Sequence, residues 1–317
     1  MSGVLSTLRV RPTRRAEGFR SARTRPVWEE RPTAAGQAGK GITLLAVMVA
    51  IVFPVYCVVL TSLSPQSSVN IAGGIVVMPH GLTFNAYREI FSDGVITRAL
   101  VISLVITLAG TAISMLVSVL CAYGLSRSRS YGHRTVLMLV IATMFISVGM
   151  IPSFIVVSDI FNGYDQYWAL VLPTAVSAFN ILILRAFYMN TANELIEAAK
   201  LDGASEPRVL WSIVLPTSKA VNAVIALFYA VGYWNSWFNI MLFMPSDSSK
   251  WPLQMVLYDY LTQNSQMVSA AAGFQNSVPT LALQMAVVTI TIVPVVIVYP
   301  FVQKHFTKGM LTGAVKG

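Results

Sequence analysis

Residues 190–220 read NTANELIEAAKLDGASEPRVLWSIVLPTSKA and separate two apolar segments of the chain. This stretch contains a spaced pattern. Glu197-Ala198-Ala199 is followed after three residues by Gly203, and nine further residues lead to Ile213 and then to Leu215-Pro216. Connections longer than about 12–15 residues are usually functional. The stretch is therefore the first candidate for a functional element.

The pattern predicts two short helices joined by a glycine turn. Thr191 and the glutamate three residues later form a capping box for a helix over Glu194–Leu201. Asp202-Gly203 ends that helix, because glycine reaches the left-handed conformation without steric cost. Ser205 is placed to cap a second helix over Pro207–Val214.

Two short helices of this composition suit a docking surface. Leu195 and Ala198–Ala199 are expected on one face of the first helix, with Lys200 on the opposite face. The alanines let another protein approach the helix backbone, and Glu197 can pair across an interface. Gly203 fixes the angle between the two helices, so that a displacement of one helix moves the membrane span that follows the loop. The alternative is an amphipathic loop that lies against lipid headgroups.

Composition places the chain in a membrane. It is 55% hydrophobic and 11% charged, with a mean hydropathy of +0.66. A bilayer core requires about 20 apolar residues per spanning helix. Six windows meet that requirement and predict an all-α integral membrane protein without a second globular domain: 42–63, 99–126, 135–158, 167–184, 221–243 and 281–302.

Lysine and arginine predict the orientation of the spans. Of the 22 such residues, all but Arg88, Arg98 and Lys250 fall on one side of the six windows. By the positive-inside rule both termini are cytoplasmic. Residues 1–40 are predicted to form a disordered basic tail, with a transit peptide as the alternative, and residues 41–317 to form the transmembrane domain. The net charge of +9 thus reflects topology rather than nucleic-acid binding.

The sequence argues against several functions. The six windows contain no Asp, Glu, Lys, Arg or His, which disfavours an ion-coupled carrier that works alone. Residues 36–41, GQAGKG, lack the spacing and the final Ser/Thr of a phosphate-binding loop. Cys57 and Cys121 lie in apolar windows and are expected to pack there rather than to bind metal. We expect no catalytic residues, no metal and no cofactor.

At the spaced pattern the chain resembles the permease subunits of binding-protein-dependent ABC importers. The resemblance implies the type I importer transmembrane fold, with residues 190–220 as the loop that docks on an ATPase subunit. It assigns coupling to the residues of the motif and the turn: Glu197, Ala198, Ala199, Asp202, Gly203, Ile213, Leu215 and Pro216.

The same resemblance implies partners and a location. A second, similar permease, two ATPase subunits and an extracytoplasmic solute-binding protein would complete the importer in a bacterial inner or plasma membrane. The binding protein would meet the outer loops, 65–97 and 245–277. The tail, 308–317, resembles the glycine-rich end of maltose-type permeases, which reaches between the ATPases.

Three further segments resemble the carbohydrate-type permeases. Pro79-His80-Gly81-Leu82-Thr83 lies in an outer loop, and Trp234–Asn239 and Lys250–Gln254 are similar to the oligosaccharide branch that uses lipoprotein binding proteins. The implied solute is a sugar or oligosaccharide. Peptides, amino acids and phosphate remain alternatives, and an ion-coupled carrier is the more distant one.

Aromatic and amide side chains mark a candidate path for the solute. Tyr229, Tyr233 and Trp237 recur every four residues and are expected on one helical face. Since no basic residue lies in the windows, a neutral or weakly charged oligosaccharide is expected. Membrane-interface anchoring of the aromatics and helix–helix bonding by the amides are the alternative roles. The candidate path residues are Asn180, Tyr233, Trp234, Asn235, Trp237, Asn239 and Gln284.

Overall fold

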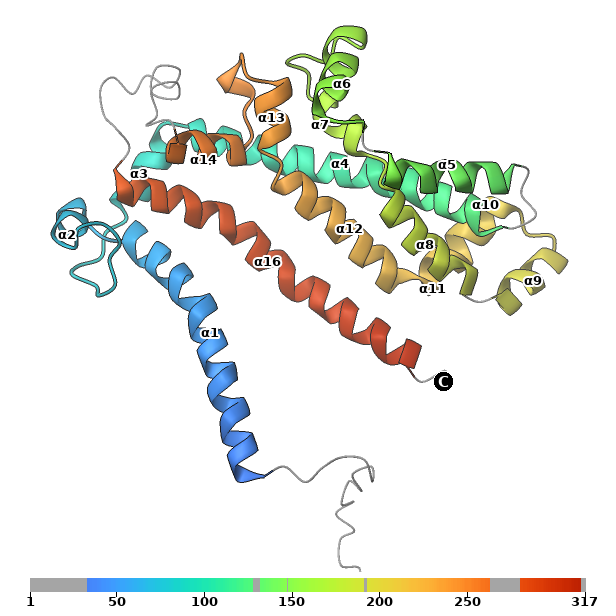
Figure 1. Cartoon of the computed structure of the whole chain (residues 1–317), viewed down its shortest axis with the longest axis horizontal. Coiled ribbons are helices and arrows are strands. Elements are labelled where there is room, and N and C mark those ends of the chain that lie inside the picture. Colours follow the sequence, from blue (N-terminus) through green and yellow to red (C-terminus); the bar gives the residue numbers. More distant parts are fainter. Residues whose placement is uncertain (1–32, 128–131, 147, 191–192, 263–279, 315–317) are drawn as a thin grey trace, which may run out of the picture. The chain divides into compact units, whose positions relative to one another are not determined.

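A computed structural model describes residues 33–127, 132–146, 148–190, 193–262 and 280–314, and this part of the chain contains helices and no strands (Figure 1). The prediction of an all-α fold is confirmed. Contact clustering divides the chain into two units, 1–53 and 54–317, and the second contains the packed core. The capping box predicted at Thr191 lies outside the described residues.

Within the described ranges, three helices are long and apolar enough to cross a bilayer without a break. They are α1 (Ala34–Ser62), α4 (Val95–Ser126) and the apolar part of α16 (Leu281–Ala314), which ends at Pro300. Proline lies inside two of them, at Pro54 in α1 and at Pro294 and Pro300 in α16. The apolar windows 42–63, 99–126 and 281–302 therefore correspond to helices.

Helix α1 corrects the predicted boundary of the basic tail. It begins at Ala34, so residues 34–40 are helical rather than part of a disordered segment. The reason is local, because Ala34, Ala35 and Ala38 favour a helix. The Thr33 hydroxyl also accepts a hydrogen bond from the Gly36 backbone N–H, 3.2 Å away, as an N-cap side chain does.

The window 135–158 is not a single helix. Helix α5 (His133–Phe145) is followed by α6 (Met150–Ile155) and a π-helical turn (Val156–Ile160), and the two parts are bent by 119°. Gly149, with φ of +83°, precedes α6 and changes the chain direction.

The window 167–184 is also bent, by 51°. It contains α7 (Trp168–Val171), a 3₁₀ turn (Leu172–Thr174) and α8 (Ala178–Asn190). Pro173 lies at the break and cannot donate a backbone hydrogen bond to continue the first helix. A third bent pair is formed by residues 206–217 and 219–234, and counting each pair as one span raises the number of spans from three to six, the predicted number, although the fifth window was predicted at 221–243.

The fifth window contains α12 (Lys219–Trp234) and α13 (Phe238–Phe243). Four further short helical elements lie in the two predicted outer loops, 65–97 and 245–277. They are α2 (Gln66–Ile71), α3 (Asn85–Ser92), a 3₁₀ turn (Ser248–Lys250) and α14 (Leu253–Thr262).

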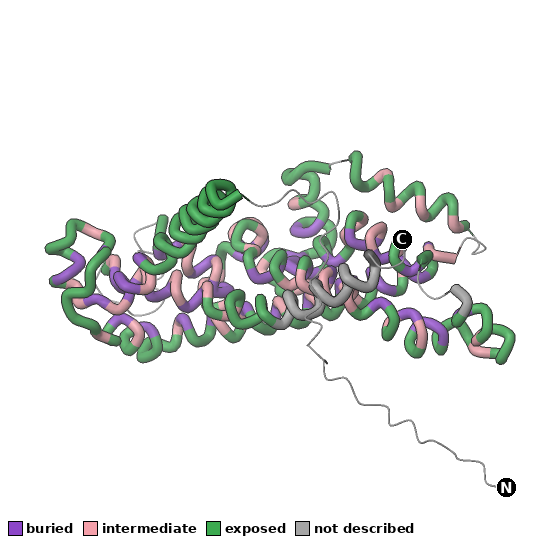
Figure 2. Tube along the Cα trace, turned by 90° about the horizontal axis from the view of Figure 1, so that it is seen from below, coloured by how far each residue is buried: buried purple, intermediate pink, exposed green. Residues whose placement is uncertain are grey.

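Helices α4, α8 and α12 form the centre of the core, and α16 packs on α12 (Figure 1). Buried residues recur along these helices, whereas α5 buries none of its side chains (Figure 2). Ser114 and Ser118 of α4 are fully buried and bond to tyrosines of α12. Small residues at such contacts let helices approach closely in a membrane.

Candidate functional site

The first part of the candidate site is the docking loop, which we define as residues 193–218. It begins with α9 (Asn193–Leu201), and Gly203 follows with φ of +79°. The Ala204 N–H bonds to the Ala199 carbonyl at 2.9 Å, and the Gly203 N–H bonds to the Lys200 carbonyl at 3.1 Å. This pair of bonds defines a Schellman motif. The predicted glycine turn is confirmed, together with the left-handed conformation that it required.

The second part of the docking loop differs from its prediction. Helix α10 (Glu206–Val209) continues into a π-helical turn (Leu210–Val214) and a last helical turn, α11 (Leu215–Thr217). Pro216 lacks an N–H and its ring would clash with a carbonyl one α-helical turn earlier, which a widened turn relieves. The helix therefore passes through Pro216 instead of ending before it.

The chain then bends by 87° between residues 206–217 and α12. Ser205 lies at the N-cap of α10, but its side chain makes no capping bond. The next-but-one residue is Pro207, which removes one of the N–H groups that such a cap would bind. The docking loop is thus an angled pair of helical segments directly connected to a span.

One face of the docking loop packs on the spans. Ile196, Val209, Leu210 and Val214 are buried in the main core, and Ile213 and Leu215 pack against it. The opposite face is open: Leu201 is 90% exposed and Trp211 60% exposed, and Glu197 and Ala198 are also exposed.

The expected face of α9 is thereby corrected. Leu195 and Ala198 are exposed, but Ala199 is half-buried and packs against the core beside Ile196. The sequence pattern did not show that Ile196 and Ala199 form the face that packs on the core, because residues of the same kind, Leu195 and Ala198, occur on the exposed face.

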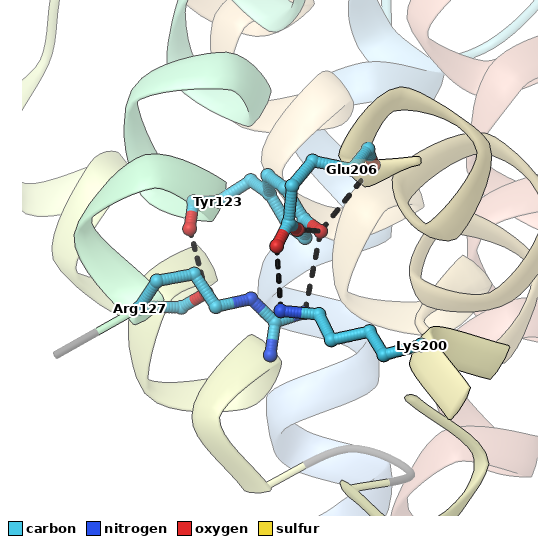
Figure 3. A network of polar contacts seen from close by, with 5 residues as sticks. Tyr123, Arg127, Lys200 and Glu206 are labelled. Atoms are coloured by element: carbon cyan, nitrogen blue, oxygen red, sulfur yellow. Dashed lines mark hydrogen bonds and ion pairs between the residues drawn. The ribbon is translucent and has the colours of Figure 1, made fainter. Parts of the chain in front are cut away.

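Polar contacts connect the docking loop to the end of α4 (Figure 3). The Tyr123 hydroxyl donates a hydrogen bond to the Glu206 carboxylate, which also forms an ion pair with Lys200 of α9. Arg127 Nη2 donates to the Tyr123 hydroxyl at 3.4 Å, and the guanidinium lies 4.8 Å from the centre of the Tyr123 ring. The hydrogen bonds from Lys200 and Tyr123 hold the pKa of Glu206 below its ordinary value, so this carboxyl is ionised at neutral pH.

A second contact fixes the same end of α4. Arg185 Nε of α8 donates to the Leu125 carbonyl at 2.8 Å. The last carbonyls of a helix have no partner within the helix, and a basic side chain satisfies one of them here. Arg185 lies within α8, so this bond joins α8 to the end of α4.

The tyrosines of the candidate solute path bind other helices. Tyr233 donates to the Val171 carbonyl at 3.1 Å and accepts from the Ser114 hydroxyl at 2.8 Å. Tyr229 lies 2.6 Å from the Ser118 hydroxyl and accepts from the Ser177 N–H at 3.3 Å. Both tyrosines are buried and hold α4, α12 and the α7–α8 segment together.

Trp237 does not share the helical face of Tyr229 and Tyr233, because α12 ends at Trp234. It stacks instead on Tyr258 of α14, with ring centres 4.4 Å apart and planes inclined by 15°. Trp237 is 36% exposed, so part of its surface remains available.

The other path candidates do not form one cluster. The Asn235 amide bonds to the Val231 carbonyl of its own helix at 2.9 Å, and the Gln284 amide donates to the Tyr260 carbonyl at 3.0 Å. Asn180 and Trp234 are buried, whereas Asn239 is half-buried. Buried Trp234 Nε1 has no hydrogen-bond partner within the described part of the chain.

Sequence reasoning missed three residues of these sites. Tyr123 and Glu206 are 83 positions apart, and no local pattern joins them. Tyr258 lies on a short outer helix that the sequence did not predict. Its only signal was its place close after the Lys250–Gln254 segment.

Among the residues that the structure describes, no group of three His, Cys, Asp or Glu side chains is arranged to hold a metal ion. Cys57 is buried and Cys121 half-buried, and both are free thiols. The site consists of a helical docking surface and aromatic and amide side chains.

The fold and the docking loop define a helical membrane permease of the ABC importer type. Residues 114–312 match the family described as "Binding-protein-dependent transport system inner membrane component", and the chain belongs to that family. It is thus a multi-pass protein of the bacterial inner membrane.

Two relatives from Bacillus subtilis (strain 168) are each 43% identical to this chain over 76% of its length. One is the polygalacturonan/rhamnogalacturonan transport system permease protein YtcP, of which 85% is covered, and the other is Protein LplC, of which 81% is covered. A solved bacterial ABC transporter involved in the import of the acidic polysaccharide alginate contains a similar chain. Its TM-score is 0.79 at 28% identity, over 88% of this chain and 99% of that one.

Proposed function

We propose that this chain is the permease subunit that passes an oligosaccharide through the membrane while a separate ATPase supplies the energy. The observation that supports this most is the docking loop, whose buried face packs on the spans while its apolar free face stays open. Leu201 and Trp211 expose apolar surface, and Ala198 is also exposed. A soluble subunit with a complementary cleft is the partner that such a rigid, angled surface suits.

The proposed assembly contains two ATPase subunits, a second permease and an extracytoplasmic binding protein. ATP hydrolysis belongs to the ATPases, and this chain is a gate without catalytic residues. Glu197, Ala198, Gly203 and Leu201 of the docking loop are proposed to contact an ATPase. The predicted tail, 308–317, is proposed as a second contact, and residues 41–317 as the permease domain.

An oligosaccharide is the proposed solute. The names of the relatives support it, since polygalacturonan and rhamnogalacturonan are polysaccharides. A further relative, 26% identical over 87% of this chain, is named for arabinooligosaccharides. Trp237 fits this solute, because a partly exposed aromatic ring supplies a face on which a sugar ring can stack.

The charge of the solute is a separate question. The apolar windows contain no basic side chain, which favours a neutral oligosaccharide. YtcP is named for a polymer whose sugar units carry carboxylates, and the alginate importer for an acidic polysaccharide. The names of these proteins are the stronger argument. We propose that the solute is an acidic oligosaccharide and that the second permease balances its negative charge.

The experiment uses the assembled transporter, purified through a tag on this chain and placed in vesicles with its binding protein. Trigalacturonate and an uncharged arabinotriose are the two probes. ATP-dependent accumulation of trigalacturonate is expected, with little uptake of arabinotriose. Preference for arabinotriose would contradict only the proposal that the solute is acidic. Accumulation of neither sugar would contradict the proposal that the solute is an oligosaccharide.

A further inference from the structure

The Glu206 side chain joins α10 to the neighbouring helix α9 and to α4, which is distant in sequence. It lies at the start of α10, forms an ion pair with Lys200 of α9, and accepts a hydrogen bond from Tyr123 in the last turns of α4 (Figure 3). The Tyr123 hydroxyl also lies 3.4 Å from the Glu206 backbone carbonyl. Tyr123 itself is buried and accepts a bond from Arg127, the residue that ends α4.

The backbone connects the docking loop directly to α12, whereas it does not connect the loop directly to α4. Residues 206–217 continue into α12 after an 87° bend, so a motion of the loop reaches α12 through the backbone. Among the described residues, α4 and the docking loop share no backbone–backbone hydrogen bond. Val209 and Leu210 of the loop lie in the same buried core as residues of α4, and such apolar packing has no preferred direction.

A hydrogen bond to a carboxylate is directional and strong. The Tyr123–Glu206 bond is therefore the contact that can turn α4 when the loop turns. Further along α4, two hydrogen bonds join this helix to α12, where Ser114 and Ser118 meet Tyr233 and Tyr229. Helix α4 is thus bonded to α12 at these two positions and to the docking loop at its end.

We propose that Glu206 is a positioning residue that makes α4 move with the docking loop, through its hydrogen bond from Tyr123. The inference rests on the proposed coupling role of that loop. Lys200 has a lesser part. The two side chains of its ion pair with Glu206 are 42% and 52% exposed, and exposed ion pairs contribute little. Tyr123 is buried, so its hydrogen bond to Glu206 is the more important of the two contacts and is the one that the variants below remove.

The test measures uptake and ATP hydrolysis separately in vesicles that contain the assembled transporter and its binding protein, with trigalacturonate as the probe. The ratio of sugar imported to ATP hydrolysed does not depend on how much transporter assembles. Tyr123→Phe and Glu206→Ala are each expected to lower this ratio by about tenfold, the factor that a lost charge-assisted hydrogen bond corresponds to.

Further variants distinguish the positioning role of Glu206 from a nonspecific effect of substitution on the structure. Glu206→Gln keeps an acceptor for Tyr123 and is expected to lose only about threefold. Lys200→Met should stay within about twofold of the wild-type ratio. Ser103→Ala is the matched control, because the Ser103 hydroxyl accepts a hydrogen bond from the Leu253 N–H at 2.7 Å and joins α4 to α14 near the end of α4 opposite to Tyr123. Its ratio should equal that of the wild type.

The double variant Tyr123→Phe/Glu206→Ala should be no worse than either single variant, since both remove one bond. Wild-type ratios in both single variants would overturn the inference. Multiplied losses in the double variant, or an equal loss in Ser103→Ala, would also overturn it. If the wild-type transporter imported no probe with ATP, the proposed function itself would fail, which is a distinguishable result.

Discussion

The ring of Tyr233 in α12 lies where a side chain on Gly110 of α4 would begin. A Cβ added to Gly110 would be 2.9 Å from three carbons of that ring. The ring is also fixed at its far end, by Ser114 at 2.8 Å and the Val171 carbonyl at 3.1 Å. Two spans of the core thus approach each other closely because one residue has no side chain.

Gly110→Val is expected to destabilise the protein, because the Tyr233 ring has to leave its hydrogen bonds to make room. Forcing extra atoms into a packed core costs about 1–3 kcal/mol. Thermal unfolding of the purified transporter would measure it. Gly124→Val in the same helix is the control, since its added Cβ would meet nothing within 4 Å. Equal melting temperatures for the two variants would contradict the close contact.

Gly203→Asp is expected to insert normally and to uncouple ATP hydrolysis from uptake. An ordinary residue at φ of +79° strains the turn, by roughly 1–2 kcal/mol, and adds a charge beside the docking surface. Gly132→Asp is the matched control, with φ of +70° and equally open surroundings. Coupled transport by Gly203→Asp at the wild-type rate would show that this turn does not transmit motion.

Leu201→Asp is expected to weaken binding of the ATPase without unfolding the permease, because Leu201 is 90% exposed. Truncating a central interface residue commonly costs more than about 1 kcal/mol, and up to several. The amount of ATPase that co-purifies with the tagged permease at increasing dilution is the measurement. Leu82→Asp, at a 67% exposed leucine in an outer loop, is the control. If both variants retained the ATPase equally, Leu201 would lie outside the contact.

Trp237→Ala is expected to raise the apparent KM for the sugar, and Trp237→Phe to restore much of the affinity. The loss of an aromatic stacking face corresponds to about 0.5–1.5 kcal/mol, or roughly threefold to tenfold in affinity. Asn235→Ala tests the neighbouring amide in the same assay. Unchanged KM and uptake in Trp237→Ala and Asn235→Ala, at normal expression, would remove these residues from the solute path.

Local patterns in the sequence predicted local structure well. The Schellman motif at Gly203 depends on residues within one helix end, so the spacing of Asp202-Gly203 was sufficient to place it. The apolar windows likewise predicted where membrane helices occur. The bend angles were not predictable, because they depend on single prolines and glycines such as Pro173 and Gly149 and on the packing around them.

Contacts between distant segments could not be predicted from the same patterns. The four-residue spacing correctly aligned Tyr229 with Tyr233, but only the fold shows that they face the serines of α4. The same spacing wrongly added Trp237, since α12 ends at Trp234 without the glycine or proline that usually marks an end. The bond between Tyr123 and Glu206 crosses 83 positions and had no signal at all.

The central claim is that this chain forms a passage but has no energy source of its own. The most direct measurement compares sealed vesicles that contain the chain alone with vesicles that contain the assembled transporter, both with the binding protein and ATP. We predict accumulation of trigalacturonate above the external concentration only with the ATPase subunits present. Accumulation of the sugar against its gradient by the chain alone would contradict the account.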